Sequence, residues 1–536
     1  MATVAEIIAR RLYSAGCRHA FGIPGGEVLT VMDALRHAGL RVTLTRHENC
    51  AGFMGEGAHH YDGAPAVLLT TIGPGLANGV NVIANAFQDR VPMIVLTGSV
   101  GAAEAQTYTH QVFDHAALVR EITKARFVMA DGAAQVMIDK AIAIAMDDQP
   151  GPVLVDVPVG LAGRQQGDDE FVGRVRPAPS MPAPCVDLEM ARHWLAGAER
   201  PLLIAGVDVL YHDDAPAAVA AFCRDLGVPL ITTYKAKGVL PEDDALCLGG
   251  AGLSPLADKH LLKLVGQSDL LILAGYDPIE MRTGWRDPWD GDKRVVEFVA
   301  VPNRHYMHQS RVSFIGHVGA GLNCLRQGVK VRDHWPDGEP TAARAALREA
   351  FRSHESWGPA AVVDEIRRRA PRHTVATVDS GAHRILLSQV WECYAVRGLL
   401  QSTALCTMGS ALPLAMGRKL AEPARPVVAF MGDGGLEMVL GELATLRDLA
   451  LPVVVVVFVD ESLALIELKQ RNSGFDNLGV DFGATDFPAV ARALGGHGQW
   501  CEDRETLGAA FEAALTRESF TVLACRIEAR PYDGRI

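Results

Sequence analysis

The chain has 536 residues, of which 49% are hydrophobic and 21% are charged. This length and composition predict three or four folded domains with sizeable buried cores, and they exclude a largely disordered chain. The formal net charge of −12 argues against nucleic acid or an anionic membrane surface as the main partner. A small anionic substrate remains compatible with this charge, because it needs only a locally cationic pocket.

The first sixteen residues predict an amphipathic helix, with Val4, Ile7, Ile8 and Leu12 along one face. They lack the basic start, apolar core and small-residue cleavage site of a secretory signal. The longest apolar run, at 453–459, is too short to span a bilayer. Ten cysteines occur without CxxC pairs or metal-type spacing, which favours reduced thiols. We therefore expect a cytoplasmic protein without a membrane partner.

Apolar runs of strand length alternate with helical stretches along the chain, a pattern typical of parallel α/β folds. Two polar, proline-containing stretches interrupt the pattern, at 163–184 and 332–340. We predict three parallel-sheet α/β domains, at 1–165, 185–331 and 350–536. The predicted strands lie at 66–71, 93–97 and 153–157 in the first domain, at 202–205, 230–233, 270–274 and 295–301 in the second, and at 374–378, 427–430 and 453–459 in the third.

The third domain carries a glycine-rich turn where a predicted strand meets a helix. The strand at 427–430 leads into Gly432-Asp433-Gly434-Gly435, and a helix begins directly afterwards. Backbone N–H groups in such a turn can face an anion, and the helix dipole adds a favourable potential. Asp433 at the strand end is well placed to hold a divalent cation that bridges two phosphates. Tight turns use the same letters, so the motif alone does not decide between a turn and a binding site.

A second acid returns to the same edge of the predicted sheet. The strand at 453–459 ends at Asp460, 27 residues after Asp433, which is the length of one helix and one parallel strand. Ligands bind at the carboxyl ends of the strands in such folds. Two oxygen ligands there, with phosphate oxygens and water, make an octahedral Mg²⁺ site. The alternative is that Asp460 and Ser462 only begin a loop.

The Gly432-Asp433-Gly434 motif, followed about 27 residues later by the end of an apolar strand, resembles the thiamine-diphosphate signature of acetolactate synthase and its relatives. That signature usually ends in two asparagines. The Val459-Asp460 found here is similar to the catabolic, FAD-independent acetolactate synthases. The resemblance covers essentially the whole chain and is strongest for the cofactor.

The resemblance implies a set of ligands in the third domain. The Asp433 and Asp460 carboxylates and the backbone carbonyl of Ser462 are expected to bind Mg²⁺. The segment Asp379-Ser380-Gly381-Ala382-His383 matches a family segment that contacts the diphosphate, with Ala382 in place of a common glutamine. The expected diphosphate contacts are Gly381, His383, Gly432, Gly434 and Gly435.

The family also requires a carboxylate near N1′ of the cofactor's aminopyrimidine ring, because this contact promotes proton removal from the thiazolium carbon C2. The family places that glutamate in the sequence RHE, and Arg46-His47-Glu48 follows a strand-like run at 42–45. A glutamate after a strand is usually a solvated surface residue, but here two further family segments flank it in the expected order. They are the glycine-rich turn ending in Gly25 and Gly26, and Gly73-Pro74-Gly75 with Asn78.

Thr407-Met408-Gly409 matches the family segment beneath the bent cofactor. The resemblance implies that Met408 wedges between the two rings and that the Cys406 carbonyl accepts a hydrogen bond from the 4′-amino group. The alternative is that Met408 only fills the core. Nearer the substrate, His110-Gln111 is similar to a Phe-Gln pair of the family pocket.

Lys124 matches a lysine that lines the entry to the family pocket. A lysine is also typical of a solvated surface, and each of the substrate-side matches at His110, Gln111 and Lys124 is weak by itself. In the second domain Tyr276-Asp277 begins the segment that stands where FAD-containing relatives carry an RFDDR-type segment. No GxGxxG turn opens a helix there either. We therefore predict a structural second domain without a dinucleotide.

These matches predict an enzyme with thiamine diphosphate and Mg²⁺ that decarboxylates a pyruvate-like 2-oxo acid. It then ligates the activated aldehyde to a second carbonyl compound, as acetolactate synthase does. The alternative is a non-ligating decarboxylase that acts on a larger or cationic 2-oxo acid. A third interpretation, a cofactor-binding protein without catalysis, is disfavoured because such a protein has no need for Glu48. The resemblance implies a homodimer or homotetramer with active sites between subunits, and the tail at 530–535 could cover the pocket or fray.

Overall fold

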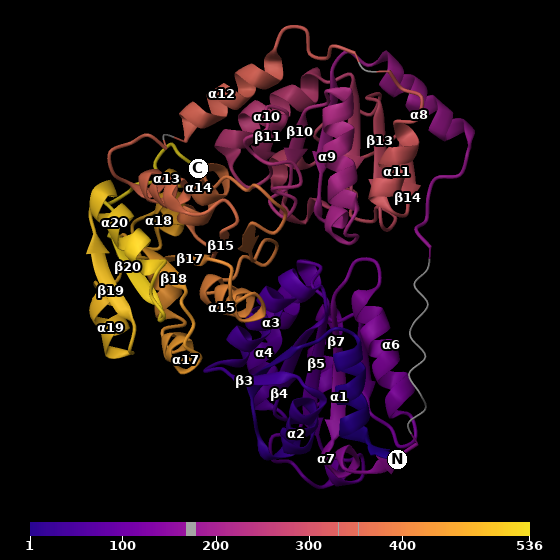
Figure 1. The fold of residues 1–536 in the computed structure, drawn as a ribbon, viewed down its shortest axis with the longest axis vertical. Helices are drawn as coiled ribbons and strands as arrows, with labels where there is room; N and C mark the ends of the chain where they lie inside the picture. The colour runs from indigo at the N-terminus through magenta and orange to yellow at the C-terminus, as the bar shows by residue number, and fades with distance from the viewer. Residues whose placement is uncertain (168–177, 331, 352) are drawn as a thin grey trace.

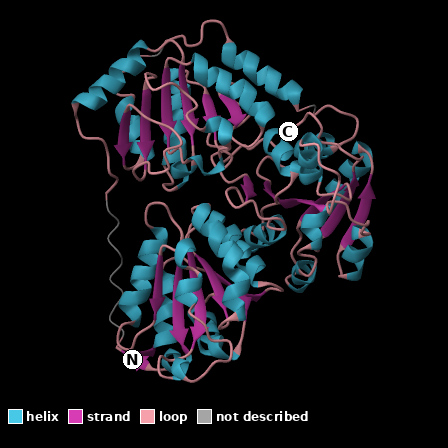
Figure 2. Ribbon diagram, turned by 180° about the vertical axis from the view of Figure 1, so that it is seen from behind, coloured by secondary structure: helices cyan, strands magenta, loops and turns pink. Residues whose placement is uncertain are grey.

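The computed structural model describes residues 1–536 except 168–177, 331 and 352. The chain forms three α/β units, each built on a six-stranded sheet in which all paired strands are parallel (Figure 1). Helices cover both faces of these sheets (Figure 2). The predicted fold class is thereby confirmed. Part of the predicted linker at 163–184, namely 168–177, lies outside the described residues, as does residue 331 at the predicted end of the second domain.

The first sheet has the strand order β3-β2-β4-β5-β7-β6. Its central strands are buried on both faces and are therefore nearly continuous apolar runs, which is why three of them were predictable. The N-terminal helix was also predicted, and a Thr3–Glu6 capping box opens it. A short antiparallel pair, β1 (Ala2–Thr3) and β8 (Gln165–Gln166), closes the unit. The other elements are β2 (His19–Ile23), β3 (Arg41–Leu44), β4 (Ala66–Thr70), β5 (Met93–Ser99), β6 (Ala125–Val128), β7 (Pro152–Pro158), α1 (Val4–Ser14), α2 (Leu29–Ala38), α3 (Glu48–Asp62), α4 (Pro74–Gln88), α5 (His115–Leu118), α6 (Ala134–Met146) and α7 (Val159–Ala162).

The second sheet has the order β11-β10-β9-β12-β13-β14, and four of its strands match predicted runs. A twelve-residue helix, α12, follows the sheet and packs on α10. The elements are β9 (Pro201–Ala205), β10 (Leu230–Thr232), β11 (Cys247–Gly250), β12 (Leu270–Ala274), β13 (Val295–Val299), β14 (Val312–Ile315), α8 (Val186–Gly197), α9 (Ala215–Leu226), α10 (Pro255–Gln267), α11 (Val318–Leu325) and α12 (Glu339–Ala350).

The third sheet has the order β16-β15-β17-β18-β20-β19, and β15, β17 and β18 are the predicted strands. The short helix α16 begins at the first residue after β17. The elements are β15 (Val375–Val378), β16 (Leu399–Gln401), β17 (Val427–Gly432), β18 (Val454–Val459), β19 (His497–Cys501), β20 (Thr521–Arg526), α13 (Pro359–Arg369), α14 (Ala382–Val390), α15 (Ala411–Ala421), α16 (Asp433–Glu437), α17 (Glu442–Asp448), α18 (Ala464–Asn472), α19 (Phe487–Ala493) and α20 (Arg504–Ala514).

The first and third units share one hydrophobic core, in which α3 packs against α15. Glycines allow the two helix backbones to touch. A Cβ added at Gly57 would lie 2.2 Å from the Leu414 carbonyl oxygen, and one at Gly417 would lie 1.9 Å from the Met54 carbonyl oxygen. The elements around Glu48 and Met408 are therefore held in a fixed relation, because α3 begins at Glu48 and α15 begins shortly after Met408.

None of the described helices combines the length and the apolar character that crossing a bilayer demands.

Candidate functional site

The predicted phosphate-side residues gather at the carboxyl ends of β15, β17 and β18. The strand order of the third sheet reverses between β15 and β17, and open α/β sheets bind ligands at such a reversal. The turn from Gly432 to Gly435 lies there, because β17 ends at Gly432 and α16 starts at Asp433. The structure therefore brings the first half of the predicted site together on one sheet edge.

Asp433 ties this turn to the neighbouring strand end. Its Oδ1 accepts the N–H of Gly434 at 2.8 Å, and its Oδ2 accepts the N–H groups of Asp460 at 3.1 Å and Glu461 at 2.7 Å. Burial raises the pKa of Asp433. Burial, and then the charge of Asp433, raise the pKa of Asp460 to about 7. The buried Asp433 and the partly buried Asp460 therefore repel one another, and a bound cation would relieve the repulsion.

Ser462 follows Asp460 in a turn that brings further oxygen atoms to the same edge. Glu461 has a positive φ of 56°, and the Ser462 hydroxyl donates to Asp481 Oδ1 at 2.7 Å. Within the described part of the chain, no three or more His, Cys, Asp or Glu side chains gather as a metal cluster. The predicted metal site differs from such a cluster, because it uses two carboxylates, one backbone carbonyl and phosphate oxygens.

Asp379 connects three segments of this half-site. The Asp379 side chain is fully buried. Its Oδ1 lies 2.9 Å from His383 Nε2, and its Oδ2 accepts the N–H of Gly409 at 2.8 Å. A Cβ added at Gly435 would lie 2.0 Å from Asp379 Oδ2, so only glycine fits there. The sequence motifs predict diphosphate contacts for His383 and Gly435, but they predict no role for Asp379. Its position directly after a predicted strand is the signal that could have found it.

The segment before α15 lies next to this half-site, because Gly409 bonds to Asp379, and it is partly exposed. Cys406 is exposed and has a φ of +58°, Met408 is only partly buried, and Gly409 has a φ of +75°. A left-handed backbone at a non-glycine residue costs energy and persists only where neighbours enforce it. Met408 therefore does not lie in the packed core, and the backbone around it is held in an unusual conformation.

The second half of the predicted site lies at the carboxyl edge of the first sheet. Glu48 is the first residue of α3 and is buried, with 5% of its surface exposed, and its Oε2 accepts the Nδ2–H of Asn78 at 3.0 Å. Gly75 lies against the same carboxylate, since an added Cβ would be 3.5 Å from Glu48 Oε1. Gly26 faces open space, with no atom within 4 Å of an added Cβ, whereas a Cβ at Gly25 would meet Thr71 Oγ1 at 2.1 Å. The predicted residues Gly25, Gly26, Glu48, Pro74 and Asn78 thus share one edge.

A buried histidine supports this edge and was not predicted. The N–H of Gly73 donates to His115 Nε2 at 3.1 Å, and His115 Nδ1 lies 2.9 Å from Asp156 Oδ1. Gly73 has a φ of +68° and precedes Pro74 at the start of α4. His115 and Asp156 therefore fix the turn that presents Gly75 and Asn78 to Glu48. No sequence signal links these residues, because they meet only in the folded sheet.

The substrate-side predictions separate into two groups. Gln111 lies against the start of α4, since a Cβ added at Gly73 would be 2.3 Å from the Gln111 carbonyl oxygen, and His110 is exposed beside it. Lys124 instead precedes β6, donates its backbone N–H to the Pro152 carbonyl at 2.8 Å, and so lies at the amino edge of the sheet. The structure places Gln111 and His110 on the Glu48 edge and Lys124 on the opposite edge of the same sheet.

The two half-sites of one chain open in different directions. In Figure 1 the helices α2 and α7, which come after β2 and β7, lie at the lower end of the first unit. The helices α14 and α18, which follow β15 and β18, lie at the upper part of the third unit. Among the described residues Glu48 has a hydrogen bond to Asn78 and none to the third unit. In this view the helices that follow these strands thus lie at opposite ends of the first and third units (Figure 1).

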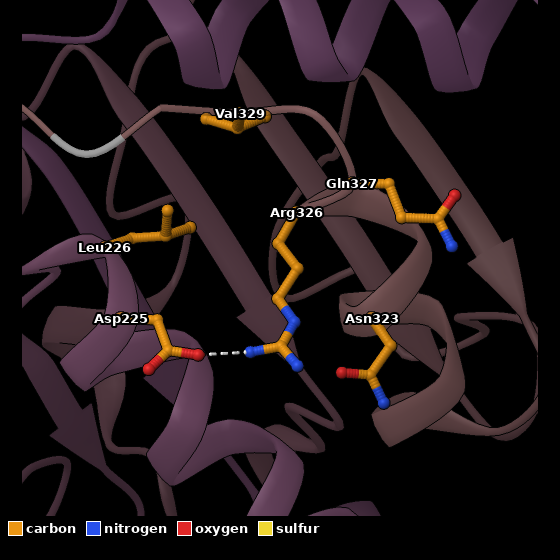
Figure 3. Close-up of a pocket in the computed structure, with 6 residues that line it drawn as sticks. All are labelled: Asp225, Leu226, Asn323, Arg326, Gln327 and Val329. Carbon is orange, nitrogen blue, oxygen red and sulfur yellow. Dashed lines mark hydrogen bonds and ion pairs between the residues drawn. The ribbon is translucent and has the colours of Figure 1, made fainter.

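The second unit has a different arrangement at its strand-order reversal, between β9 and β12. A Cβ added at Gly206 would lie 2.4 Å from the Gly275 carbonyl oxygen, so the two turns close on one another. A surface pocket of about 500 Å³ lies elsewhere, at the C-terminal ends of α9 and α11, where Asp225 pairs with Arg326 at 2.6 Å (Figure 3). It is remote from the carboxyl ends of the strands and belongs to neither half-site.

The residues present suit thiamine diphosphate and Mg²⁺. The carboxylates of the buried Asp433 and the partly buried Asp460 supply the hard oxygen atoms that Mg²⁺ prefers. The glycine turn at the start of α16 supplies backbone N–H groups for a diphosphate. Glu48 supplies a buried carboxylate, and Gly26 on the same edge of the first sheet has open space around an added Cβ. The donor set and the close glycines fit such a cofactor.

Comparison with known protein families gives matches along most of the chain. The N-terminal thiamine pyrophosphate-binding domain of thiamine pyrophosphate enzymes matches residues 2–118. The central domain of these enzymes matches residues 188–325, and their C-terminal thiamine pyrophosphate-binding domain matches residues 379–525. Fold, site and family matches together define a thiamine diphosphate-dependent enzyme.

The chain is also similar over nearly its full length to characterised relatives. It is 30% identical to the acetolactate synthase isozyme 1 large subunit of Escherichia coli, over 92% of this chain and 88% of the relative. It is 28% identical to an acetolactate synthase of Bacillus subtilis, over 97% and 92%, and 28% identical to a protein of Pseudomonas aeruginosa named as a probable 2-ketoarginine decarboxylase, over 98% and 94%. The chain belongs to the acetolactate synthase-like family of thiamine diphosphate-dependent enzymes.

Proposed function

We propose that this enzyme decarboxylates a pyruvate-like 2-oxo acid and ligates the product fragment to a second carbonyl compound. The observation that carries the proposal is the pair of half-sites. One has a single buried glutamate, Glu48, and the other has the buried Asp433 and the partly buried Asp460 beside a glycine turn. These are the groups needed at the opposite ends of thiamine diphosphate.

When bound, thiamine diphosphate supplies an electron sink for the loss of CO₂. Glu48, oriented by Asn78, is proposed to accept a hydrogen bond from the aminopyrimidine and to assist proton transfer there. Such general acid–base help is worth about 10²- to 10⁴-fold in rate. The partly exposed Met408 is proposed to support the bent cofactor, and the Cys406 carbonyl to accept from its amino group.

Asp433, Asp460 and the Ser462 carbonyl are proposed to hold Mg²⁺ against the diphosphate, and the expected diphosphate contacts include Gly381, His383 and the glycines of the 432–435 turn. The buried Asp379 keeps His383 and Gly409 in place. Gln111 and His110 lie on the Glu48 edge and are proposed to face the substrate. Lys124 is not included in this pocket, since it lies at the other edge of the sheet.

The oligomer proposed here is a homodimer, or a tetramer made of two such dimers, with cofactor sites between subunits. The support is the position of the helices that follow the two sets of strands. Those of the first unit lie at its lower end, and those of the third unit lie at its upper part (Figure 1). A second copy related by a two-fold axis can bring the Glu48 edge of each chain to the Asp433 edge of the other.

The test is product analysis with pyruvate as the only substrate, in the presence of thiamine diphosphate and Mg²⁺. Acetolactate is the expected product. Acetaldehyde, or no turnover of pyruvate, would reject ligation.

The second candidate is a decarboxylase without ligation that acts on a larger, cationic 2-oxo acid. The similarity to the probable 2-ketoarginine decarboxylase over 98% of the chain favours it. The same assay with 2-ketoarginine decides between the two. Release of CO₂ with formation of the corresponding guanidino aldehyde, and no acetolactate from pyruvate, would establish the second candidate.

A further inference from the structure

One stripe of polar residues on α4 holds the loop at 402–407, which leads into Met408. Asn81, Asn85 and the C-cap residue Asp89 are spaced four apart, so they lie on one face of the helix. All three bond to the loop. Asn78, three residues before Asn81 on the same stripe, bonds to Glu48. The helix α4 therefore contacts both Glu48, the proposed catalytic carboxylate, and the loop at 402–407.

The middle of the stripe is a buried hydrogen-bond chain. The Ser402 hydroxyl donates to Asn85 Oδ1 at 2.6 Å and accepts the N–H of Thr407 at 2.9 Å. Asn85 Nδ2 in turn donates to Glu56 Oε2 at 2.9 Å. Asn85, Glu56 and Ser402 are at most 1% exposed, so loss of one partner leaves others unsatisfied away from water.

The two ends of the stripe fix the rest of the loop. Asp89 accepts the N–H groups of Thr403 and Ala404, both at 2.8 Å, and forms an ion pair with Lys235 at 3.0 Å. At the more exposed end, the Thr407 hydroxyl donates to Asn81 Oδ1 at 3.0 Å. Residues on both sides of Cys406 are therefore held by α4, which explains how Cys406 keeps its left-handed backbone.

We infer that Asn81, Asn85 and Asp89 are positioning residues for the reaction: they set the Cys406 carbonyl and Met408 beneath the cofactor. The inference rests on the proposed function. α4 contacts both Glu48 and the loop at 402–407 of its own chain. In the proposed dimer, Glu48 and this loop belong to two different active sites. The helix is then a rigid connection between the two sites of the dimer.

The test uses Asn81→Ala and Asn85→Ala in the full-length enzyme. The readouts are the dissociation constant of thiamine diphosphate with Mg²⁺ and the rate at which the C2 proton of the bound cofactor exchanges with deuterium. A lost hydrogen bond worth 0.5–1.5 kcal/mol predicts a dissociation constant raised about 3-fold for Asn81→Ala and about 10-fold for Asn85→Ala, whose partners are buried. C2 exchange is expected to slow in both variants.

A matched control is Asn303→Ala, which removes an asparagine whose Nδ2 donates to the His308 carbonyl in the second unit. It is expected to leave both readouts unchanged. Thr407→Ser keeps the hydroxyl bond to Asn81 and is expected to behave as wild type, whereas Thr407→Val reproduces Asn81→Ala. The double variant Asn81→Ala/Thr407→Val is expected to be no worse than either single one.

If Asn81→Ala and Thr407→Val bind thiamine diphosphate and exchange C2 as the wild type does, the inference is overturned even if Asn85→Ala fails to fold. A lower melting temperature without a change in either readout also overturns it, because it assigns the stripe a structural role only. Failure of the wild-type enzyme to bind thiamine diphosphate would instead overturn the proposed function.

Discussion

Glu56 is a buried carboxyl whose protonation is expected to make stability depend on pH. Burial, together with the charge of Asp89, raises the pKa of Glu56 from an ordinary value of 4.5 to about 8, although Lys235 and the hydrogen bond from Asn85 oppose the shift. The native state therefore binds a proton that the unfolded state releases between these values. The free energy of unfolding should fall as pH rises through this window, by at most about 1.4 kcal/mol per pH unit. Glu56→Gln stays neutral and should flatten the melting temperature between pH 5.5 and 8.

The control for this experiment is Glu505→Gln, which changes an exposed glutamate at the start of α20. Its melting temperature should keep the pH profile of the wild type. Parallel profiles for Glu56→Gln and the wild type would contradict the prediction.

The candidate site residues that sequence motifs predict differ physically from those that become apparent only through contacts in the structure. Glu48, Asp433 and Asp460 could be named because each lies within four residues of the end of a strand, in a short local motif. Asp379 and Asn85 act through contacts with segments 30 or more positions away, such as Gly409 and Ser402. Asp379 has one local signal, its position directly after a predicted strand, but the contacts themselves leave no local pattern, and Asn85 in isolation is an ordinary polar residue.

Helix packing between α3 and α15 depends on a glycine that can be tested. A Cβ at Gly417 would lie 1.9 Å from the Met54 carbonyl oxygen, a backbone atom that cannot swing aside. Gly417→Ala must push the two helices apart, and overpacking of this kind costs about 1–3 kcal/mol. Chemical denaturation should show the loss. Gly266→Ala is the control, because that helical glycine has no atom within 4 Å of an added Cβ and should gain about 0.5–1 kcal/mol. Equal stability of Gly417→Ala and wild type would refute the close contact.

Most of the predicted strands are buried on both faces, although the edge strand β3 was also predicted and the buried β20 was not. β4, β12 and β18 are fully buried and consist of apolar runs, so their burial is visible in the sequence. β6 and β19 lie at sheet edges, and their residues alternate between partly buried and exposed. A four- or five-residue edge strand with polar members is set by its pairing with a neighbour, which a single sequence does not display.

The arrangement of the molecule decides whether a chain can be active alone. The alternation of strands and helices in the sequence predicted three parallel-sheet domains along the chain. It did not predict the directions in which the two half-sites open. Those directions depend on how α3 packs on α15, and that contact is made by residues more than 300 positions apart. In Figure 1 the helices α2 and α7, which come after β2 and β7, lie at the lower end of the first unit, whereas α14 and α18, which follow β15 and β18, lie at the upper part of the third unit.

Mixed dimers test this arrangement directly. Glu48→Gln and Asp433→Asn homodimers should both be inactive, since each lacks one half of every site, and Glu48→Gln should keep most of its affinity for thiamine diphosphate. A dimer purified with one subunit of each kind has one site with both residues intact if sites lie between subunits. It should then show about half of the wild-type activity per dimer. If each site were formed within a single chain, no chain in the mixed dimer would carry both residues, and the mixed dimer would be as inactive as its parents.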